Sequence, residues 1–383
     1  MTKNQSKTTW GTARLGDVAT LHRGYDLAVG EMQKGNYPVV FSNGKIEYHN
    51  AYKVKGPGVV TGRSGTLGNI FYVSGNYWPH NTTLYVSDFH GNVPRFVYYL
   101  FKTLDFGHLN AGSGVPTLNR NHVHEIDVTI TNDRDEQERI AESLSAFDGK
   151  IENNNRLIKG LEQMAQEIFK EWFIVPSQEN ILQKGWIVKK VSDIAKLNRG
   201  VSYRSSELSE VGEGVAMINL ANFLRGGGFN PLGTKNYTGK FKETHKVKPG
   251  QILVAMTDIT SNREIVGHPA RVPESLDGAV ISLDVCSIET EDRYIEFLYF
   301  LMLRKSFAQL MASSATGTNV SHLSKTNVED FEFVLPDGKA LDRFSEVVRP
   351  MVTQQDALNN ENRKLITMRD FLLPRLMSGE IQV

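Results

Sequence analysis

Two stretches of the chain carry apolar residues in the pattern of a coiled-coil helix. The first runs through ten positions whose spacing alternates between four and three residues: Ile140, Leu144, Phe147, Ile151, Asn154, Ile158, Leu161, Ala165, Ile168 and Trp172. Residues at this spacing line one face of a helix and pack against another helix. The pattern predicts a helix from Glu136 to Trp172, about 55 Å long at 1.5 Å per residue.

The second stretch, 207 residues later, has the same spacing and predicts a second helix. Its positions are Val347, Met351, Gln354, Leu358, Glu361, Leu365, Met368 and Leu372. Because either apolar face would be unstable alone, we expect the two helices to cover each other as an antiparallel pair. A single Asn154 in the seam favours one register, and Pro350 and Pro374 predict a bend or an interruption. A strut that serves only oligomerisation stays open as an alternative.

Outside these helices, in each half of the chain, the pattern is typical of short strands. β-branched runs of strand length occur at Gly58–Val73 and Gly250–Ile259, among Gly, Asn and Tyr residues. The stretches Leu15–Leu21 and Val191–Leu197 also predict short strands. Helical patterns of moderate length follow at 93–104 and 292–311. The chain is therefore expected to mix helices and strands.

The order of these elements repeats. "RLGDVATLHRG" at 14–24 and "KVSDIAKLNRG" at 190–200 share Asp, Ala, Leu, Arg and Gly in register. Later similarities, "GSGVPTLNRNHVHEIDV" with "GTNVSHLSKTNVEDFEF" and "IENNNR" with "LNNENR", lie 205 and 207 residues apart. A shared frame with divergent interiors indicates a tandem duplication. We predict globular domains at 1–135 and 177–340, and helical segments at 136–176 and 341–383.

The composition is that of an ordinary globular protein. Lys and Arg total 43, as do Asp and Glu, so no global basic field indicates nucleic acid. The single cysteine, Cys286, excludes a disulfide framework and lies in an apolar run that predicts a buried thiol. The polar N-terminus has no signal-peptide pattern, and no apolar run approaches the ~18 residues of a membrane span. These features favour a soluble, cytoplasmic protein.

Catalytic motifs are missing from the sequence. It has no phosphate-binding P-loop, methyltransferase signature, nucleophile elbow or zinc-protease motif. "GRSGTLG" at 62–68 has the wrong spacing for a dinucleotide loop and predicts a tight turn between strands. His122 and His124 would share one face of a strand, but no third ligand lies nearby. No catalytic residue and no metal site are therefore predicted.

The loops that follow the strands are rich in residues that contact nucleic acid. Arg suits guanine, Asn suits adenine, and Ser, Thr and backbone amides hold phosphates. Similar loops stand at matching positions of both repeats, and residues 1–135 carry 13 basic against 10 acidic residues. Candidate DNA contacts in the first repeat are Arg23, Tyr25, Arg63, Ser64, Thr117, Asn119 and Arg120. Those in the second are Arg199, Tyr203, Arg204, Asn262, Arg263, Asn319, His322 and Lys325. That these are simply solvated loops stays open.

The sequence of the C-terminal helix resembles a known family. "NENRKLITMRDFLLPRLMSGEIQV" at 360–383 is similar to the second conserved helical region of type I restriction-modification specificity subunits (HsdS). The matching residues are Arg369, Asp370, Leu372, Leu373, Pro374, Leu376, Gly379, Glu380 and Ile381. The helix at 137–174 looks like the first conserved region, and the two openings resemble the starts of target recognition domains. The resemblance extends over the whole chain in the same order of parts.

The resemblance implies a fold and a function. The fold would be α+β, with two tandem α/β target recognition domains related by pseudo-twofold symmetry and separated by two long antiparallel coiled-coil helices. Each domain would read half of a bipartite double-stranded DNA site. The helices would set the spacer and dock two modification (methyltransferase) subunits, to which restriction (translocase and nuclease) subunits add. This chain would be non-catalytic and without a cofactor, with S-adenosylmethionine, ATP and Mg on partner subunits.

Three alternatives remain at this level. The chain could be a specificity subunit of another restriction-modification type, or an inverted, phase-variable copy of such a gene. It could also be a coiled-coil adaptor that does not bind DNA. A stand-alone nuclease or methylase is disfavoured by the missing motifs.

Overall fold

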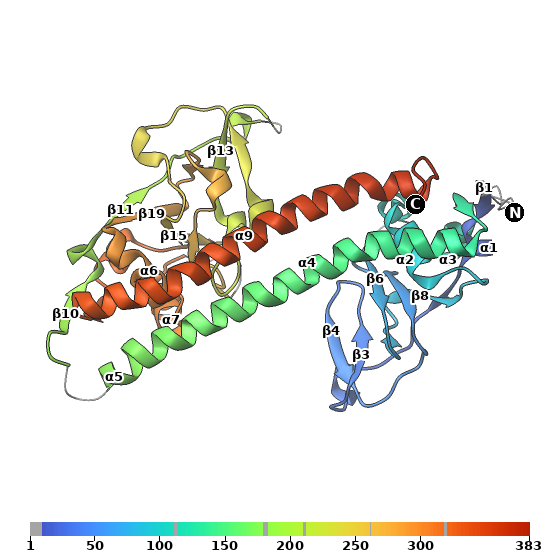
Figure 1. Cartoon of the computed structure of the whole chain (residues 1–383), viewed down its shortest axis with the longest axis horizontal. Helices are drawn as coiled ribbons and strands as arrows, with labels where there is room; N and C mark the ends of the chain where they lie inside the picture. The colour runs from blue at the N-terminus through green and yellow to red at the C-terminus, as the bar shows by residue number, and fades with distance from the viewer. Residues whose placement is uncertain (1–9, 111–113, 179–182, 210–211, 261, 318–319) are drawn as a thin grey trace, which may run out of the picture. The chain divides into compact units, whose positions relative to one another are not determined.

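The computed structural model describes residues 10–110, 114–178, 183–209, 212–260, 262–317 and 320–383 (Figure 1). Residues group into two compact units: unit 1 is Met1–Asn154 with Glu361–Val383, and unit 2 is Asn155–Asn360. Both units mix helices and short strands, which confirms the expected fold class. The units divide both long helices, so they differ from the four segments predicted from the sequence, and that division stays a prediction.

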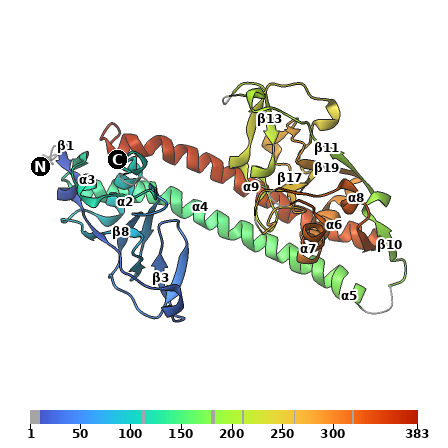
Figure 2. The same cartoon turned by 180° about the vertical axis from the view of Figure 1, so that it is seen from behind.

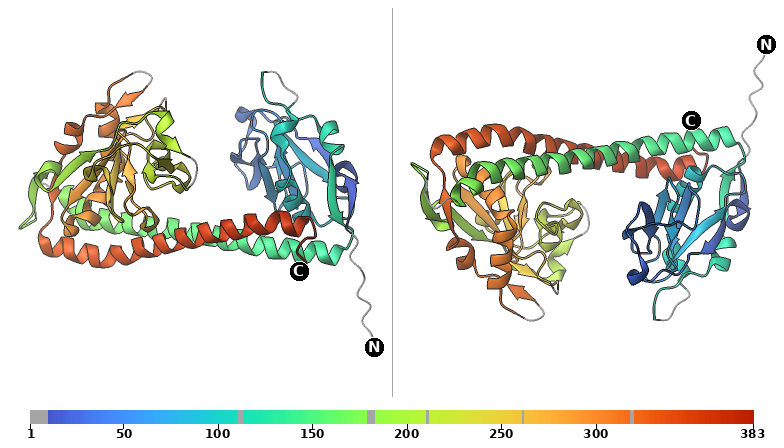
Figure 3. Two further views of the ribbon diagram at one scale, coloured as in Figure 1. Left: turned by 90° about the horizontal axis from the view of Figure 1, so that it is seen from above. Right: turned by 90° about the horizontal axis from the view of Figure 1, so that it is seen from below.

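The longest elements are two helices. Helix α4 spans Arg134–Phe169 and continues through a π-helical turn at Lys170–Ile174 into α5, Val175–Gln178. Helix α9 spans Gly338–Met377. In both units α9 lies beside α4 (Figures 1 and 3). The contacting pairs, in order along α4, are Asp148 with Arg369, Asn154 with Asn362, Ile158 with Gln355 and Phe169 with Phe344. Partner numbers fall as α4 advances, so the predicted antiparallel pairing is confirmed.

The α4 seam includes the predicted positions. Ile140, Leu144 and Asn154 are buried, and their side chains have at most 1% exposure. Partly buried members are Phe147, Ile151, Ile158 and Leu161. The helix therefore turns its heptad face inward along its length.

The α9 seam differs from the prediction at alternate positions. Leu358 is buried and Met351, Leu365 and Leu372 are partly buried, as expected. Val347 and Met368, however, are 37% and 53% exposed, so their assignment to the seam is wrong. The inward face instead runs through Phe344, Val348, Gln355, Asn362, Arg369 and Leu376. The aromatic core of unit 2 buries Phe344 and Val348, which turns Val347 outward.

Of the bend or interruption expected at the prolines of α9, the interruption is wrong, because the helix is continuous through both, and the bend stays a prediction. Pro350 and Pro374 lie on its exposed face. Each removes one backbone donor, but water can reach the carbonyl that loses its partner.

A four-stranded antiparallel sheet forms the centre of each unit. In unit 1 its order is β2 (Thr20–Arg23), β8 (Thr83–Asp88), β5 (Gly58–Gly62) and β6 (Ile70–Val73). In unit 2 the order is β11 (Ala195–Arg199), β19 (Val285–Thr290), β15 (Ile252–Ala255) and β17 (Pro269–Arg271) (Figure 2). The same order in both units agrees with a tandem duplication. "GRSGTLG" connects β5 and β6, as predicted.

Each unit has a second sheet that contains one parallel pair. Unit 1 orders β4 (Ile46–His49), β3 (Tyr37–Val40) and β7 (Trp78–Pro79). Unit 2 orders β12 (Leu208–Ser209), β14 (Lys235–Tyr237), β13 (Val215–Ile218) and β18 (Val280–Ile281). The remaining pairs are β1 (Trp10–Arg14) with β9 (Asp127–Thr131), β10 (Ile187–Lys190) with β21 (Glu332–Leu335), and β16 (Thr257–Asp258) with β20 (Ser321–His322).

The openings of the two repeats are not single strands, which corrects the prediction. Each begins with a short helical turn, α1 (Leu15–Val18) or a 3₁₀ turn (Val191–Asp193), before β2 or β11. Leu15 and Val18 are both buried, because a spacing of three residues puts them on one helical face.

Short helices complete the units. They are α2 (Pro94–Lys102), α3 (Arg120–His124), α6 (Asp292–Met302), α7 (Lys305–Ser314) and α8 (Lys325–Glu329). Apolar faces of α2 and α6 enter the cores of unit 1 and unit 2. Within the described ranges, no helix combines the length and apolar character that a membrane crossing requires.

Candidate nucleic-acid interface

The Arg-Gly pair that ends β2 and β11 has a clear structural reason. A Cβ on Gly24 would lie 2.1 Å from the His80 carbonyl oxygen, and one on Gly200 would lie 2.1 Å from the Ile281 carbonyl oxygen. These approaches are too close for any side chain, so only glycine fits. The strand end is thereby held against a neighbouring loop in both units.

Matching backbone hydrogen bonds hold the next loop in place. In unit 1, Arg63 N–H donates to Thr82 O at 2.8 Å and Arg63 O accepts from Leu118 N–H at 2.8 Å. In unit 2, Met256 N–H donates to Asp284 O at 2.8 Å and Met256 O accepts from Leu323 N–H at 2.7 Å. The loops that the sequence singled out thus meet at one edge of each unit.

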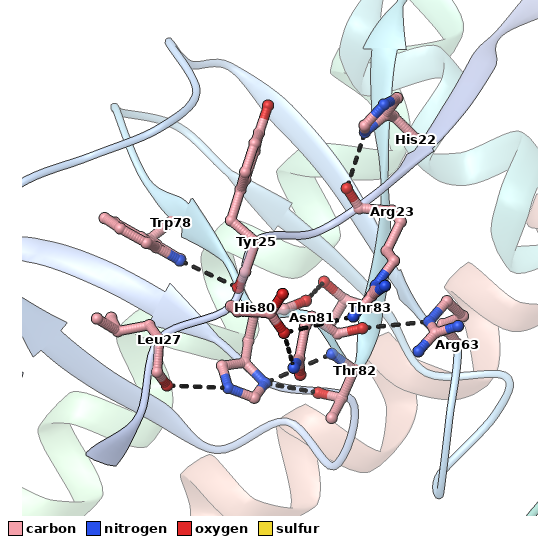
Figure 4. Close-up of polar contacts among 11 residues, drawn as sticks. His22, Arg23, Tyr25, Leu27, Arg63, Trp78, His80, Asn81, Thr82 and Thr83 are labelled. Atoms are coloured by element: carbon pink, nitrogen blue, oxygen red, sulfur yellow. Dashed lines mark hydrogen bonds and ion pairs between the residues drawn. The ribbon is translucent and has the colours of Figure 1, made fainter. Parts of the chain in front are cut away.

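Unit 1 presents two arginines at this edge (Figure 4). Arg63 Nε donates to Asn81 O at 3.1 Å. Arg23 Nη2 lies 3.3 Å from Asp26 Oδ1, to which Asn81 Nδ2 also donates. Burial lowers the pKa of Arg63, the charge of Arg23 lowers it further, and Asp26 partly opposes this. Asp26 pairs with Arg23 and acts on Arg63 only through its charge, so two guanidinium groups near one carboxylate leave the edge positive and suited to an anionic or acceptor-rich ligand.

Aromatic side chains lie next to these arginines. Tyr25 OH is hydrogen-bonded to Tyr85 OH at 2.9 Å, and Trp78 Nε1 donates to Tyr25 O at 3.3 Å. Lys53 Nζ stands over the Trp78 ring at 4.9 Å and near the Tyr25 ring at 5.9 Å. Cations and aromatic rings in alternation are typical of surfaces that bind nucleic acid.

His80 supports the same loop as a neutral ring. Its Nε2 lies 3.3 Å from Leu27 O, and its Nδ1 lies 3.1 Å from Thr82 Oγ1 (Figure 4). A carbonyl only accepts, so Nε2 carries the proton and Nδ1 is the acceptor. Burial lowers the pKa of His80, against the opposing effects of the Leu27 carbonyl and Asp26. The ring therefore holds residues 80–82 in position through these two hydrogen bonds.

Unit 2 carries different chemistry on the same frame. Met256, where unit 1 has Arg63, is fully buried. Arg199 Nε donates to Leu283 O at 2.9 Å. Thr257 Oγ1 donates to Asp284 Oδ1 at 2.9 Å. Asp258 accepts from three backbone N–H groups, and although burial alone would raise its pKa, these hydrogen bonds bring it below the ordinary value. At this edge a backbone carbonyl holds Arg199, and two carboxylates, Asp258 and Asp284, are buried or half-buried.

The other candidates of unit 1 lie around the Arg63 loop. Ser64 forms a backbone bridge with Thr117, so the structure brings these two together. Asn119 Oδ1 accepts from Asn121 N–H at 3.0 Å and caps α3, which commits its oxygen to the fold. Arg120 is exposed at the first position of α3.

The candidates of unit 2 are less uniform. Arg204, Asn262 and His322 are exposed, and Lys325 pairs with Glu329 at 3.1 Å. Tyr203 packs against Tyr237 in an apolar cluster, and Arg263 Nη1 donates to Ala312 O at 2.7 Å, so both make internal contacts. Asn319 lies outside the described residues.

The expected strand at His122 and His124 is wrong, because both lie on helix α3. His124 Nε2 accepts from Leu21 N–H at 2.9 Å, which ties α3 to β2. Burial and the charge of Arg120 lower the pKa of His124, so the ring is neutral as an acceptor must be. His124 is thus a structural residue of the edge.

Sequence reasoning missed several residues of the unit 1 edge. Lys53 and Trp78 are far from the opening motif in sequence, and nothing in their pattern indicates that they meet. The sequence pattern did not indicate Asn81 either, although its backbone carbonyl accepts from Arg63 Nε and its Nδ2 donates to Asp26 Oδ1. Asp26 stands in the motif "LHRGYD" and could have been named from its spacing to Arg23.

Comparisons with known proteins agree with this architecture. Residues 7–163 match the family described as type I restriction modification DNA specificity domain. The specificity subunit of the type I restriction enzyme MjaIX from Methanocaldococcus jannaschii is 26% identical over 326 residues, 76% of this chain and 70% of the relative. That of HindI from Haemophilus influenzae is 21% identical over 328 residues, 70% of this chain and 71% of the relative.

A solved structure gives the same result for the fold. The S subunit of a type I restriction-modification system from M. genitalium superimposes with a TM-score of 0.65 at 16% identity and covers 98% of both chains. The predicted resemblance is therefore confirmed by sequence and by fold. The family is one of recognition subunits, which agrees with the expectation that the chain is not itself an enzyme. Residues 7–163 thus carry the type I restriction modification DNA specificity domain, and the chain is similar in sequence and in fold to type I restriction enzyme specificity subunits.

Proposed function

We propose that this chain reads a bipartite double-stranded DNA target, with one half-site read by each unit. The observation that carries the proposal is the shared backbone frame at the edge of both units, which holds Arg63 in one and Met256 in the other. A frame that stays constant while its side chains change suits two half-sites of different sequence. Arg, Asn, Ser and Thr at such an edge supply donors for base edges and phosphates.

The helix pair would set the spacer between the half-sites. Asn154 Nδ2 donates to Glu361 Oε2 at 2.8 Å and to Asn362 Oδ1 at 2.9 Å. A polar contact inside an apolar seam favours one register, because a shifted register separates the buried Asn154 amide from the buried Asn362. The sequence offsets support this role, since Asn154 and Glu361 are equivalent positions of the two repeats.

Partner subunits would dock on the outer faces of the helices. Large apolar side chains there are exposed: Leu157, Met164, Val347, Ile366, Met368 and Phe371. Exposed apolar groups on an otherwise polar helix favour a protein interface. In this proposal two modification subunits carry S-adenosylmethionine, and restriction subunits carry ATP and Mg. This chain contributes recognition and no cofactor.

The proposal is tested by genomic methylation. The chain is expressed with its cognate modification subunit in a methylation-free host, and methylated bases are mapped by single-molecule sequencing. We expect adenine methylation in both halves of an interrupted motif. A purified soluble complex that adds no methylation, and binds no duplex above a scrambled control, would instead indicate a coiled-coil adaptor.

A second measurement tests the docking surface. The paired change Met368→Lys and Phe371→Lys is expected to weaken co-purification of the modification subunit, because both side chains are more than half exposed and contribute little to the folded chain. The matched control is Lys364→Ala on the same helix. Undiminished co-purification with the lysine pair would place the docking surface elsewhere.

A further inference from the structure

Each unit holds one arginine by the same backbone carbonyl, but the arginine comes from a different strand. In unit 1, Arg63 after β5 donates its Nε to Asn81 O at 3.1 Å. In unit 2, Arg199 at the end of β11 donates its Nε to Leu283 O at 2.9 Å. Asn81 and Leu283 are equivalent, because each lies two residues before the residue, Thr83 or Val285, whose carbonyl accepts from Gly24 or Gly200.

The anchoring leaves the end of each guanidinium available. Among the residues that the structure describes, no protein acceptor is hydrogen-bonded to the Nη1 or Nη2 groups of Arg63 or Arg199. The planar fork is therefore oriented by Nε and keeps its terminal N–H groups for a ligand. Holding the side chain in advance reduces the conformational entropy that binding would otherwise cost.

Other arginines at these edges lack this arrangement. Arg23, the sequence equivalent of Arg199, is paired with Asp26 and half exposed. Arg204 is exposed, and its backbone N–H rather than its guanidinium makes the local hydrogen bond, to Glu207 Oε2 at 2.7 Å. An exposed or carboxylate-paired arginine suits a phosphate, which needs charge but no fixed plane.

Resting on the proposed function, we infer that Arg63 and Arg199 are the guanine-reading residues of the two half-sites. Guanine presents O6 and N7 in the major groove, and a fixed guanidinium bonds both at once. With Nε occupied, only the end-on approach through Nη1 and Nη2 remains. Arg23 and Arg204 would instead contact phosphates and fix the position of the duplex.

A comparison of the two edges also accounts for the different strands from which the two guanine-reading arginines come. Met256 is fully buried in unit 2, so the position after β15 cannot present a side chain to DNA there. The arginine at the end of β11 takes over the carbonyl at Leu283. In unit 1 that carbonyl's equivalent is already bonded by Arg63, and Arg23 turns to Asp26 instead.

The experiment compares four single variants of the full chain, each expressed with the modification subunit in the methylation-free host. Arg63→Lys and Arg199→Lys keep the charge but lose the fork, while Arg23→Ala and Arg204→Ala remove the proposed phosphate contacts. The readout is the set of methylated sites. The half-site that is not targeted serves as an internal control for folding.

We expect Arg63→Lys to admit other bases at one guanine position of one half-site, and Arg199→Lys to do so in the other half. The ratio of Kd for matched and substituted duplexes should fall by about 5- to 150-fold, the value of one bidentate contact. Arg23→Ala and Arg204→Ala should weaken binding to all sequences and keep the motif.

Two results would overturn the inference and leave the proposed function intact. One is a wild-type motif with no G·C pair in one half. The other is a pair of lysine variants whose motif and Kd ratios equal those of the wild type. A wild-type complex that methylates no interrupted motif would instead remove the proposed function itself.

Discussion

Unit 1 and unit 2 share strand order and backbone hydrogen bonds but differ in the side chains that these present. At one position of the common frame, unit 1 has a partly exposed Arg63 and unit 2 a fully buried Met256. The backbone contacts on either side differ in length by at most 0.1 Å. The frame is therefore independent of this side chain, and a single position can belong to the surface in one copy and to the core in the other.

Each unit also contains a charged cluster that involves a helix, and the two clusters differ in burial. In unit 1, Asp148 of α4 joins Arg369 of α9 at 2.7 Å and Tyr99 of α2 at 2.7 Å, and the two charged side chains are 24% and 16% exposed. In unit 2, Arg271 and Glu296 form a two-bonded pair at 3.2 and 2.5 Å with 11% and 4% exposure. The Arg271–Glu296 pair is almost fully buried, so the loss of one partner should lower the free energy of unfolding by more there than in unit 1.

The largest effect is expected from exchanging the residues at the shared position. Met256→Arg places a charge in the core of unit 2 and should lower the free energy of unfolding by about 4 kcal/mol or prevent folding. Arg63→Met replaces a partly exposed side chain and should change it by less than about 1 kcal/mol. Urea denaturation measures both. Equal losses would show that the two positions are not equivalent in burial.

A smaller difference is expected between the two charged clusters. Glu296→Gln should cost about 3 kcal/mol, because it leaves the buried Arg271 guanidinium without a counter-charge. Asp148→Asn should cost about 1 kcal/mol, since Arg369 keeps Asp370 at 2.7 Å. Limited proteolysis with mass spectrometry would assign each loss to its unit. A costlier Asp148→Asn would contradict the ranking by burial.

The next largest effect is expected from removing the polar contact in the helix seam. Asn154→Leu removes the donor to Asn362, which is 7% exposed, and should cost about 1–2 kcal/mol. The helix pair should stay folded but looser in register, so methylation would tolerate more than one spacer length. Ile151→Leu, on the same face, is the control. A spacer preference equal to that of the wild type would argue against a role for Asn154 in register.

The smallest effect concerns pH. The folded state holds His124 neutral with a lowered pKa, so the unfolded chain binds its proton more tightly. Stability should fall as the pH drops below the ordinary value of 6.5, by less than about 0.5 kcal/mol because water screens much of the ring. His124→Gln should show a smaller fall in Tm between pH 7.5 and 5.5. An equal fall in both proteins would exclude His124 as its source.

Much of the fold could be predicted from the sequence by itself. The heptad spacing determined the two long helices and their pairing, because a continuous apolar face needs a partner wherever it lies. The repeated motifs determined that two units share one frame, and the repeated Arg-Gly pair marked the strand end where the backbone approaches a neighbouring loop. The family followed from the C-terminal helix. These features are local in sequence, so periodicity and motif identity were sufficient to find them.

Only the tertiary structure decided which face of α9 points inward and which candidates meet. Val347 and Val348 are chemically alike, and the position of Phe344 in the unit 2 core selected between them. The same applies to Arg63 and Met256, whose equivalence rests on hydrogen bonds to residues far away in sequence. Asn81 and Leu283 hold arginines through carbonyls, which every residue has. A backbone acceptor does not depend on residue type, so the sequence cannot indicate the hydrogen bonds from Arg63 to Asn81 and from Arg199 to Leu283.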